Sequence, residues 1–378
     1  MKLTIPKTTL ASTLSRVQGI CSGRNTMAIL SNVLLHAWPK ALHLSATDLE
    51  VGYTTMVEGA VIEKAGKITL PAKKLHEIIA HIPTDNVTLE LCEDNCRVNI
   101  TGGTYFSTLA GIAADEFPAM PPVNGDTFDL DASAILRLLG HVDYCMSKDE
   151  KMYHLCGVLL QVQTREEENL SPRLIAAATD GHRLACDSSA LPGEPRPVPK
   201  DLLRGCIVSR KGVGELKKLR TEGILVITIA GNNLSITTEY ETLFLRLVDG
   251  EFPNWRAIVP ANIAGTIETK RSPLIDALDR VSLLSADNHR GTTWDIAEGG
   301  INFRATNPEL GEASDRVTAV VGVDPREFRL NANYINQALT SMDCGIVQIH
   351  LPKDELSPIK ITPTCEEEPF AVIMPMRL

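Results

Sequence analysis

A short sequence pattern occurs three times along the chain at nearly equal intervals. Its fullest copy is Ala178-Thr179-Asp180-Gly181-His182-Arg183-Leu184-Ala185, and the reduced copies are Ala46-Thr47-Asp48-Leu49 and Ala305-Thr306-Asn307-Pro308. The central Asp or Asn residues of successive copies are 132 and 127 positions apart, which is the size of an ordinary domain. A repeat of this length predicts that the chain contains the same domain three times.

Apolar residues flank each copy in the same way. A stripe at helical spacing precedes every copy and another follows it, which predicts two helices per repeat. The preceding stripes are Leu10/Leu14/Val17, Ile135/Leu139/Val142 and Leu274/Leu278/Val281, and the following ones are Leu75/Ile78/Ile79/Ile82, Val213/Leu216/Leu219 and Ile335/Ala338/Leu339/Met342. Alternating segments such as 51–57 and 243–247 predict strands with one buried face. Each repeat is therefore expected to be an α+β domain.

The ends of the repeats follow from the same comparison. Glu116-Phe117-Pro118 and Glu251-Phe252-Pro253 are 135 positions apart and close the first two units. We therefore expect domains at residues 1–123, 124–260 and 261–378. The segment 191–199 has the composition of a linker, but the repeat places it inside the second domain as a long loop.

The composition of the chain indicates where in the cell the protein is expected and whether it is expected to bind a metal. No stretch approaches the 18 or more apolar residues of a membrane span, and the first residues lead into an amphipathic helix and not into a signal peptide, so we expect a cytoplasmic protein. Nine cysteines are scattered without a CxxC pair, which argues against a disulfide framework and a zinc site. We interpret the nearest pair, Cys92 and Cys96, as turn or buried thiols, and we expect no metal.

The motifs of common enzymes are absent from the sequence. Lys211-Gly212-Val213-Gly214 lacks the spacing of a phosphate-binding loop, and there is no GxGxxG after a strand, no HExxH and no GxSxG. A catalytic role would rest on Asp180 and His182 with a distant serine, and an Asp-Gly-His triplet in a turn is usually structural. The chain is expected to have no enzymatic activity and to need no cofactor.

Charge is distributed unevenly between the predicted helices and the rest of the chain. The net charge is -10, yet the helix windows carry 17 Lys or Arg against 8 Asp or Glu, and the remainder carries 20 against 39. The windows are 6–24, 72–82, 132–151, 210–220, 270–290 and 331–342. Basic helices on an acidic body are compatible with a nucleic-acid partner despite the negative total.

Several segments carry a resemblance to a known family. Ala178 to Ala185, Leu247-Val248-Asp249-Gly250-Glu251-Phe252-Pro253, Pro260 and the terminal Met374-Pro375-Met376-Arg377-Leu378 resemble the bacterial DNA polymerase III beta subunit, the sliding clamp. The resemblance implies a processivity factor that encircles double-stranded DNA without sequence specificity. It also implies a head-to-tail homodimer that closes a ring of six domains, with helices lining the channel and antiparallel sheets outside.

Domain size agrees with a dimeric ring. A domain of about 125 residues corresponds to a sphere about 36 Å across, and three touching spheres leave a hole of about 6 Å. That hole is narrower than the DNA major groove, which is about 12 Å wide. Six spheres leave a hole about as wide as one sphere, so two chains are needed to encircle a duplex.

The charge pattern and the resemblance together suggest DNA-contacting residues. Contacts to phosphate attract DNA without reading its sequence, so a basic inner wall can hold a duplex and let it slide, while an acidic exterior disfavours adhesion to other DNA. The residues that we expect nearest the DNA backbone are Arg24, Lys73, Lys148, Arg210 and Lys211.

The resemblance further implies a groove that takes short peptide motifs from the DNA polymerase III alpha subunit, the clamp-loader complex and other partners. Met374 and Met376 are expected beside Leu184, because methionines suit a surface that repacks for several partners. The implied groove residues are Leu155, Thr179, Gly181, His182, Arg183, Leu184, Pro253, Ile258, Leu356, Val372, Met374, Pro375, Met376, Arg377 and Leu378. The sequence departs from the family at Ala257 and Pro358, which leaves the preferred peptide open.

The implied dimer interface brings Phe106 of one chain against Leu283 and Leu284 of its partner. The apolar stripe of the preceding helix needs only one of these two consecutive leucines, so the other is available for an interface. The alternative reading of the whole chain is a scaffold that binds peptides without encircling DNA.

Overall fold

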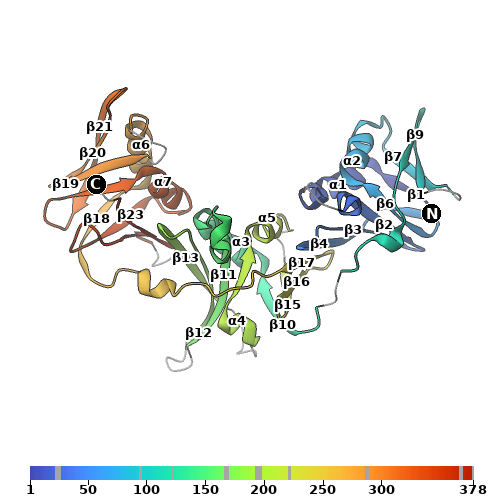
Figure 1. Cartoon of the computed structure of the whole chain (residues 1–378), viewed down its shortest axis with the longest axis horizontal. Helices are drawn as coiled ribbons and strands as arrows, with labels where there is room; N and C mark the ends of the chain where they lie inside the picture. Colours follow the sequence, from blue (N-terminus) through green and yellow to red (C-terminus); the bar gives the residue numbers. More distant parts are fainter. Residues whose placement is uncertain are drawn as a thin grey trace. The chain divides into compact units, whose positions relative to one another are not determined.

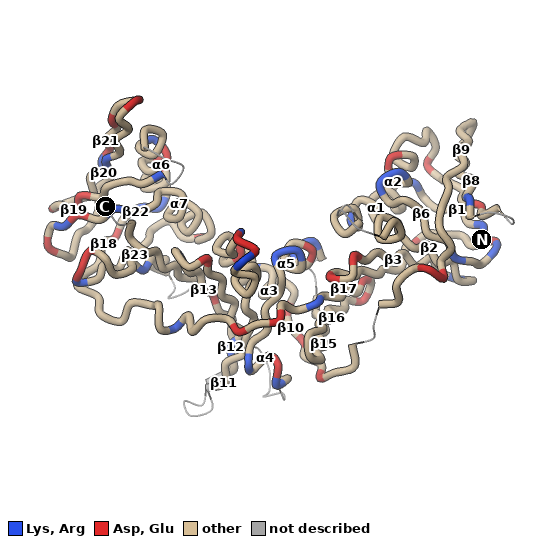
Figure 2. Tube along the Cα trace, in the orientation of Figure 1, with Lys and Arg blue, Asp and Glu red and all other residues tan. Residues whose placement is uncertain are grey.

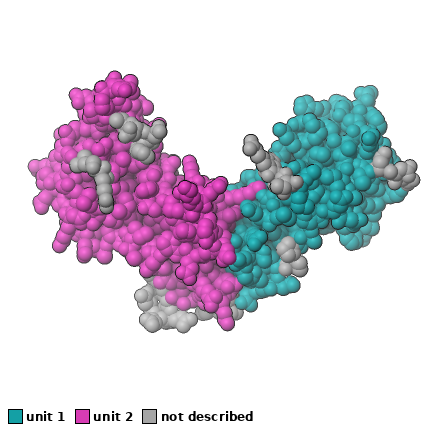
Figure 3. Space-filling view, in the orientation of Figure 1, with its two compact units in different colours: residues 1–132, 214–247 teal, residues 133–213, 248–378 magenta. Residues whose placement is uncertain are grey.

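The computed structural model describes residues 1–21, 27–92, 96–120, 123–165, 170–191, 198–219, 223–285, 290–365 and 369–376 (Figure 1). The chain divides into two compact units, coloured separately in Figure 3. The first comprises Met1–Ala132 and Gly214–Leu247, and the second comprises Ser133–Val213 and Val248–Leu378. The expected middle domain therefore contributes residues to both units.

The first unit contains two antiparallel sheets with helices α1 (Lys7–Cys21) and α2 (Ala72–His81). The five-stranded sheet runs in the order β5 (Val61–Lys64), β1 (Lys2–Pro6), β7 (Asn86–Leu91), β8 (Arg97–Gly102), β9 (Tyr105–Ala110). The eight-stranded sheet runs β10 (Asp126–Asp131), β15 (Ile224–Ala230), β16 (Asn233–Thr237), β17 (Glu241–Arg246), β4 (Val51–Val57), β3 (Ala41–Thr47), β2 (Asn32–Trp38), β6 (Gly66–Pro71). The predicted stripe of α1, Leu10, Leu14 and Val17, is buried.

The eight-stranded sheet continues across the boundary expected between the first two domains. β4 pairs with β17, and Tyr53 lies opposite Leu243 in the antiparallel register. The Tyr53 hydroxyl donates to the carboxylate of Glu241 at 2.5 Å, and both residues are buried. Backbone pairing and a buried polar contact therefore hold this junction together.

The second unit contains one twelve-stranded antiparallel sheet. It runs in the order β14 (Cys206–Ser209), β11 (Gly157–Arg165), β12 (Leu170–Thr179), β13 (Arg183–Ala190), β25 (Phe370–Ile373), β24 (Ile359–Pro363), β23 (Ile346–Pro352), β18 (Ile263–Lys270), β21 (Gly311–Val321), β20 (Gly300–Asn307), β19 (Gly291–Ala297), β22 (Arg326–Asn331). Its helices are α3 (Ala132–Val142), α4 (Lys200–Arg204), α6 (Arg271–Ser282) and α7 (Ala332–Thr340), and α5 (Arg210–Leu216) crosses from this unit into the first.

Two helices end earlier than their windows predicted. α3 stops at Val142 and is followed by the 3-10 turns Asp143–Cys145 and Glu150–Leu155. α5 stops at Leu216, and it contains two glycines, which are poor helix formers. The predicted loop at 191–199 lies mostly outside the described residues, and α4 begins directly after it.

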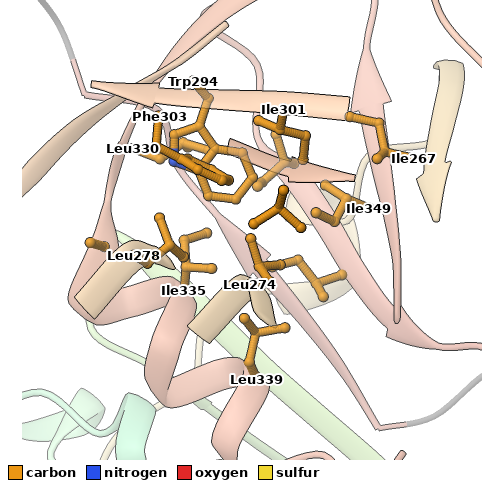
Figure 4. Packing of buried hydrophobic residues seen from close by; sticks show 14 of the residues in the cluster. Ile267, Leu274, Leu278, Trp294, Ile301, Phe303, Leu330, Ile335, Leu339 and Ile349 are labelled. Atoms are coloured by element: carbon orange, nitrogen blue, oxygen red, sulfur yellow. The ribbon is translucent and has the colours of Figure 1, made fainter. Parts of the chain in front are cut away.

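The largest part of the core lies between the sheet of the second unit and the helices α6 and α7. Figure 4 shows Leu274 and Leu278 of α6 pointing toward the same interior as Ile335 and Leu339 of α7. Trp294 and Phe303 meet edge to face with ring centres 5.0 Å apart. The apolar stripes predicted for the third repeat are therefore the buried faces of its helices.

The repeated motif forms the same hairpin turn in each copy. The side-chain oxygen of the central Asp or Asn accepts two backbone amides from the residues that follow, so the chain reverses between two strands. These bonds measure 3.0 and 2.7 Å at Asp48, 3.0 and 3.1 Å at Asp180, and 2.9 and 3.1 Å at Asn307. The turns connect β3 to β4, β12 to β13 and β20 to β21, at equivalent places in the three repeats.

Candidate functional site

The turn between β12 and β13 carries the fullest copy of the motif. Thr179 is buried, and its hydroxyl donates to the carbonyl of Arg183 at 2.7 Å. Gly181 has a φ of 87°, which glycine adopts without steric strain. The turn leaves Gly181 and His182 exposed, whereas Leu184 at the start of β13 is fully buried.

Leu184 and Val372 lie in one apolar cluster beside this turn. They are opposite each other in the pairing of β13 with β25. The cluster also contains Trp255, from the 3-10 helix Trp255–Ile258. Its buried members are Leu159, Ile175, Ala177, Leu184, Cys186, Trp255, Phe370 and Val372. Leu184 and Val372 therefore form the floor beneath the turn and not its exposed surface.

The segment after β25 runs from the turn to the far edge of the sheet. The Met374 amide donates to the carbonyl of His182 at 2.9 Å, and the Met374 side chain is 38% exposed. The Met376 amide donates to the carbonyl of Arg329 in β22 at 2.8 Å, and the Met376 sulfur lies beside Gly291. Pro375 between them is half-buried. Met374 thus lies at the turn and Met376 lies on β19 and β22.

The remaining predicted groove residues are spread around this region. Leu155 is buried at the end of its 3-10 turn, and Pro253 lines a cleft of about 560 Å³ beside β11 and β14. Ile258 is partly exposed, and Leu356 is exposed in a turn where Asp354 accepts its amide at 3.1 Å. Arg377 and Leu378 lie outside the described residues.

Arg183 connects the second and third repeats. Its side chain is only 9% exposed, and it donates to Asp180 at 2.9 Å and to the carbonyl of Tyr144 at 2.7 Å. It also donates to Gln337 of α7, and its guanidinium stacks on the ring of Tyr334 with the centroid 4.3 Å away. These contacts occupy the guanidinium inside the protein, so Arg183 holds the turn against α7.

Two further basic side chains of the second repeat are held by a buried acid. Arg137 and His141, both on α3, each approach the same oxygen of Asp187 at 2.8 Å. Asp187 is completely buried, and the second ring nitrogen of His141 lies 3.6 Å from Asp343 in the third repeat. Arg137 was counted in the basic helix windows, but in the structure it pairs with Asp187, to which His141 is also hydrogen bonded.

Lysine and arginine residues occur on α2 and α5 (Figure 2). Lys73 is exposed on α2 beside Lys74, which pairs with Glu77 at 2.6 Å. On α5, Arg210 donates to the carbonyls of Met146, at 2.9 Å, and of Ser147. Arg210 therefore supports the segment that carries the exposed Lys148. Lys211 is half-buried on α5, and Arg24 lies outside the described residues.

The predicted interface residues lie near two open strand edges or directly after a helix. Phe106 is 64% exposed on β9, which is the edge strand of the five-stranded sheet. Leu283 is 71% exposed directly after α6, and Leu284 is half-buried. Within the part of the chain that the structure describes, residues 311–317 of β21 pair only with β20, so this stretch is a second open edge.

Family models match nearly the whole chain in three consecutive parts. They describe the N-terminal, central and C-terminal domains of the DNA polymerase III beta subunit, and they match residues 1–121, 129–254 and 256–377. The chain belongs to the DNA polymerase III beta subunit family.

Characterised relatives and solved structures agree with this assignment. The beta sliding clamps of Pseudomonas putida and Vibrio cholerae are 31% and 29% identical to the chain, and each match covers the full length of this chain and of the relative. The sliding clamp of Bartonella birtlesii bound to griselimycin superposes with a TM-score of 0.92 at 30% identity. The Caulobacter crescentus clamp, with polyethylene glycol bound to a putative beta-motif tethering region, superposes with a TM-score of 0.91 at 28% identity. Each superposition covers the whole of this chain and the whole of the other clamp chain.

The three family domains confirm the threefold repeat and the α+β class predicted from the sequence. Sliding clamps are non-catalytic processivity subunits, so the work of this clamp is binding and not turnover. None of the helices in the described ranges is long and apolar enough to cross a membrane. In the same ranges, no three His, Cys, Asp or Glu side chains are grouped as metal ligands would be.

Sequence reasoning missed the residues that join the second and third domains of this clamp. Tyr334 and Gln337 occupy the polar side of α7, and nothing in the apolar stripe of that helix points to Arg183. Asp187 lies within strand β13, and the alternation of apolar and polar residues along this strand does not indicate that its side chain is buried. The available signal was the carboxylate of Asp187 directly after the apolar run Leu184–Cys186, because a charge within a buried strand usually requires a partner.

Proposed function

We propose that two copies of this chain close head to tail into a ring that encircles duplex DNA and slides along it without reading the sequence. The ring tethers the DNA polymerase III alpha subunit, the clamp-loader complex and other replication and repair proteins. We further propose that it acts in the cytoplasm, and that its domains are divided after residues 123 and 260.

The observation that carries the DNA-binding proposal is the location of the cations. Lys73 and Lys211 lie on helices, while the chain as a whole is acidic. In the proposed ring these helices face the channel, where lysine and arginine attract phosphates without choosing a register. The proposed contacts are Arg24, Lys73, Lys148, Arg210 and Lys211.

Open strand edges support the proposed closure. The edge strand β9 and residues 311–317 of β21 each have one side without a strand partner among the described residues. Exposed edges of this kind are templates for pairing with a second chain. We propose that β9 of one protomer meets β21 of the other, with Phe106 packed against Leu283 and Leu284 of the partner.

We propose that peptide motifs dock beside the turn at Thr179–Leu184. Met374 exposes apolar surface at this turn, and Ile258 and Leu356 expose apolar surface in the same unit; a docked peptide would cover these side chains. The exposed His182 would lie at the rim of the docking surface. Ala257 and Pro358, where the sequence departs from its family, tune which peptide binds.

The ring and the non-encircling scaffold differ in their response to salt. A scaffold held only by phosphate contacts leaves DNA when salt rises, because its affinity falls steeply with ionic strength. A ring that a clamp loader and ATP have closed around nicked circular DNA stays linked at high salt. Loss of the loaded protein from intact nicked circles in high salt would show that it binds without encircling.

A further inference from the structure

Two cysteines that are 21 positions apart in the sequence meet in the third domain. Cys344 lies between α7 and β23, and Cys365 lies between β24 and β25. The pairing of β23 with β24 continues past its last ladder pair, because the Thr364 amide donates to the carbonyl of Ile346 at 3.2 Å. The backbone of Gly345 therefore faces Cys365, and Cys344 is its immediate neighbour.

Side-chain contacts bring the two sulfurs together. The sulfur of Cys344 donates to the carbonyl of Ile346 at 2.7 Å and lies 3.7 Å from the hydroxyl of Thr364, the residue before Cys365. Cys365 is close enough to Cys344 to affect its pKa. A disulfide needs sulfur atoms about 2.0 Å apart on backbones that are already close. The β ladder supplies the close backbones, so side-chain rotation suffices to bring the sulfurs into bonding distance.

The two thiols differ in access, which suits a two-step oxidation. Cys365 is exposed, whereas Cys344 is buried. Burial acts to raise the pKa of Cys344, but its interactions with the backbone of Ile346 and Thr364 and with the side chains of Cys365 and Thr364 outweigh burial and lower the pKa to about 7. By contrast, burial raises the pKa of Cys206 to about 12, which leaves that thiol protonated and unreactive.

We propose that Cys344 and Cys365 are an oxidisable dithiol that forms a reversible disulfide when the clamp meets a peroxide. The exposed Cys365 thiolate attacks one peroxide oxygen, which breaks the O–O bond and gives a sulfenic acid and hydroxide; the hydroxide takes up the proton that Cys365 released on ionising and becomes water. The Cys344 thiolate then attacks the Cys365 sulfur, forms the S–S bond and expels hydroxide, which takes up the proton from Cys344 and becomes a second water. Two thiols and one hydrogen peroxide thus become one disulfide and two waters, with two electrons passing from sulfur to oxygen.

The position of the pair links this chemistry to the junction of the second and third domains. Asp343, next to Cys344, is the residue that faces His141 at 3.6 Å. Cys365 leads into β25, which pairs with β13 and carries Val372. A disulfide here would tie the loop that precedes β25 to the loop between α7 and β23.

Peptide mapping of the full-length clamp tests the proposal. The reduced protein is treated with hydrogen peroxide, its remaining thiols are alkylated, and it is digested without reductant. We expect a cross-linked pair of peptides containing Cys344 and Cys365, loss of two hydrogens from the intact mass, and recovery of both thiols with dithiothreitol. Cys96→Ser, which removes an exposed thiol of the first unit, should leave the cross-link unchanged.

The variants Cys344→Ser and Cys365→Ser should each abolish the cross-link. Cys344→Ala replaces Cys344→Ser if the buried hydroxyl prevents folding, which a thermal melt of the variant would reveal. The proposal is overturned if Cys365 proceeds to a sulfinic acid, or bonds to another cysteine, while Cys344 remains available to the alkylating reagent.

Discussion

Backbone conformation at a single glycine shapes the turn beside the docking surface. Gly181 has a φ of 87°, and an added Cβ would have no neighbour within 4 Å, so only backbone strain opposes a larger residue. Gly140 in α3 also has open space, but its backbone is helical. Gly181→Ala should lower the free energy of unfolding by about 1 kcal/mol, whereas Gly140→Ala should raise it by up to about 1 kcal/mol. Urea unfolding followed by circular dichroism should therefore give opposite signs, and equal signs would contradict the assigned strain.

Arg183 provides a second test at the residue scale. Arg183→Ala removes charge-assisted bonds to Asp180 and to the Tyr144 carbonyl and leaves Asp180 without its cation. We expect a loss of about 3 kcal/mol in unfolding free energy. Arg256→Ala is the matched control, because this exposed arginine stacks on Trp255 and should cost less than about 1 kcal/mol. An Arg183→Ala protein as stable as the Arg256→Ala protein would show that Arg183 does not anchor the turn.

These residues also show which features could be predicted from the sequence and which could not. The Thr-Asp pair predicts a turn, because hydroxyl and carboxylate oxygens next to a strand end accept nearby amides. The partners of Arg183 could not be predicted, because Tyr334 and Gln337 are about 150 positions away and no local pattern encodes that distance. Arg137 was counted with the basic helix charge for the same reason, since its partner Asp187 becomes adjacent only in the folded domain.

At the scale of helices and strands, local periodicity was sufficient and long-range pairing was not. The stripe beginning at Leu274 and the one beginning at Ile335 are the buried faces of α6 and α7, as predicted. The pairing of β4 with β17 and of β13 with β25 joins strands far apart in the sequence, and alternation along one strand does not identify its neighbour. The two junctions nevertheless share one backbone contact, as expected of a repeat. The Arg246 amide donates to the carbonyl of Glu50 at 2.8 Å, and the Met374 amide donates to the carbonyl of His182 at 2.9 Å.

The segment after β25 is the element most directly tied to docking. Deleting residues 374–378 removes the bond from Met374 to His182 and the bond from Met376 to Arg329. If a docked peptide loses on the order of 100 Å² of apolar contact, about 2.5 kcal/mol is lost, which is close to a hundredfold in affinity. Titration of a fluorescent polymerase-derived peptide should show this weakening, while sedimentation velocity should show an unchanged dimer. Equal affinities for the two proteins would place the docking site elsewhere.

At the scale of the whole molecule, the proposed dimer depends on two surfaces of different domains. Leu283 is exposed after α6 and Leu284 follows it, and Phe106 is exposed on the edge strand β9. Replacing both leucines by Ala should convert the dimer to a monomer in sedimentation velocity, because apolar contacts at the interface are lost. Leu356→Ala removes a comparably exposed leucine from the turn between β23 and β24, outside the proposed interface, and serves as the control. Undiminished dimer stability of the double variant would rule out this interface.

The central claim is that the closed dimer is linked topologically to DNA. The most direct measurement loads the clamp on a nicked circular plasmid with a clamp loader and ATP, removes the loader, and then cuts the plasmid once with a restriction enzyme. The account predicts that the clamp stays on the uncut circle and is lost from the cut DNA by sliding off its ends. Equal retention on cut and uncut DNA would contradict encirclement and favour the non-encircling scaffold.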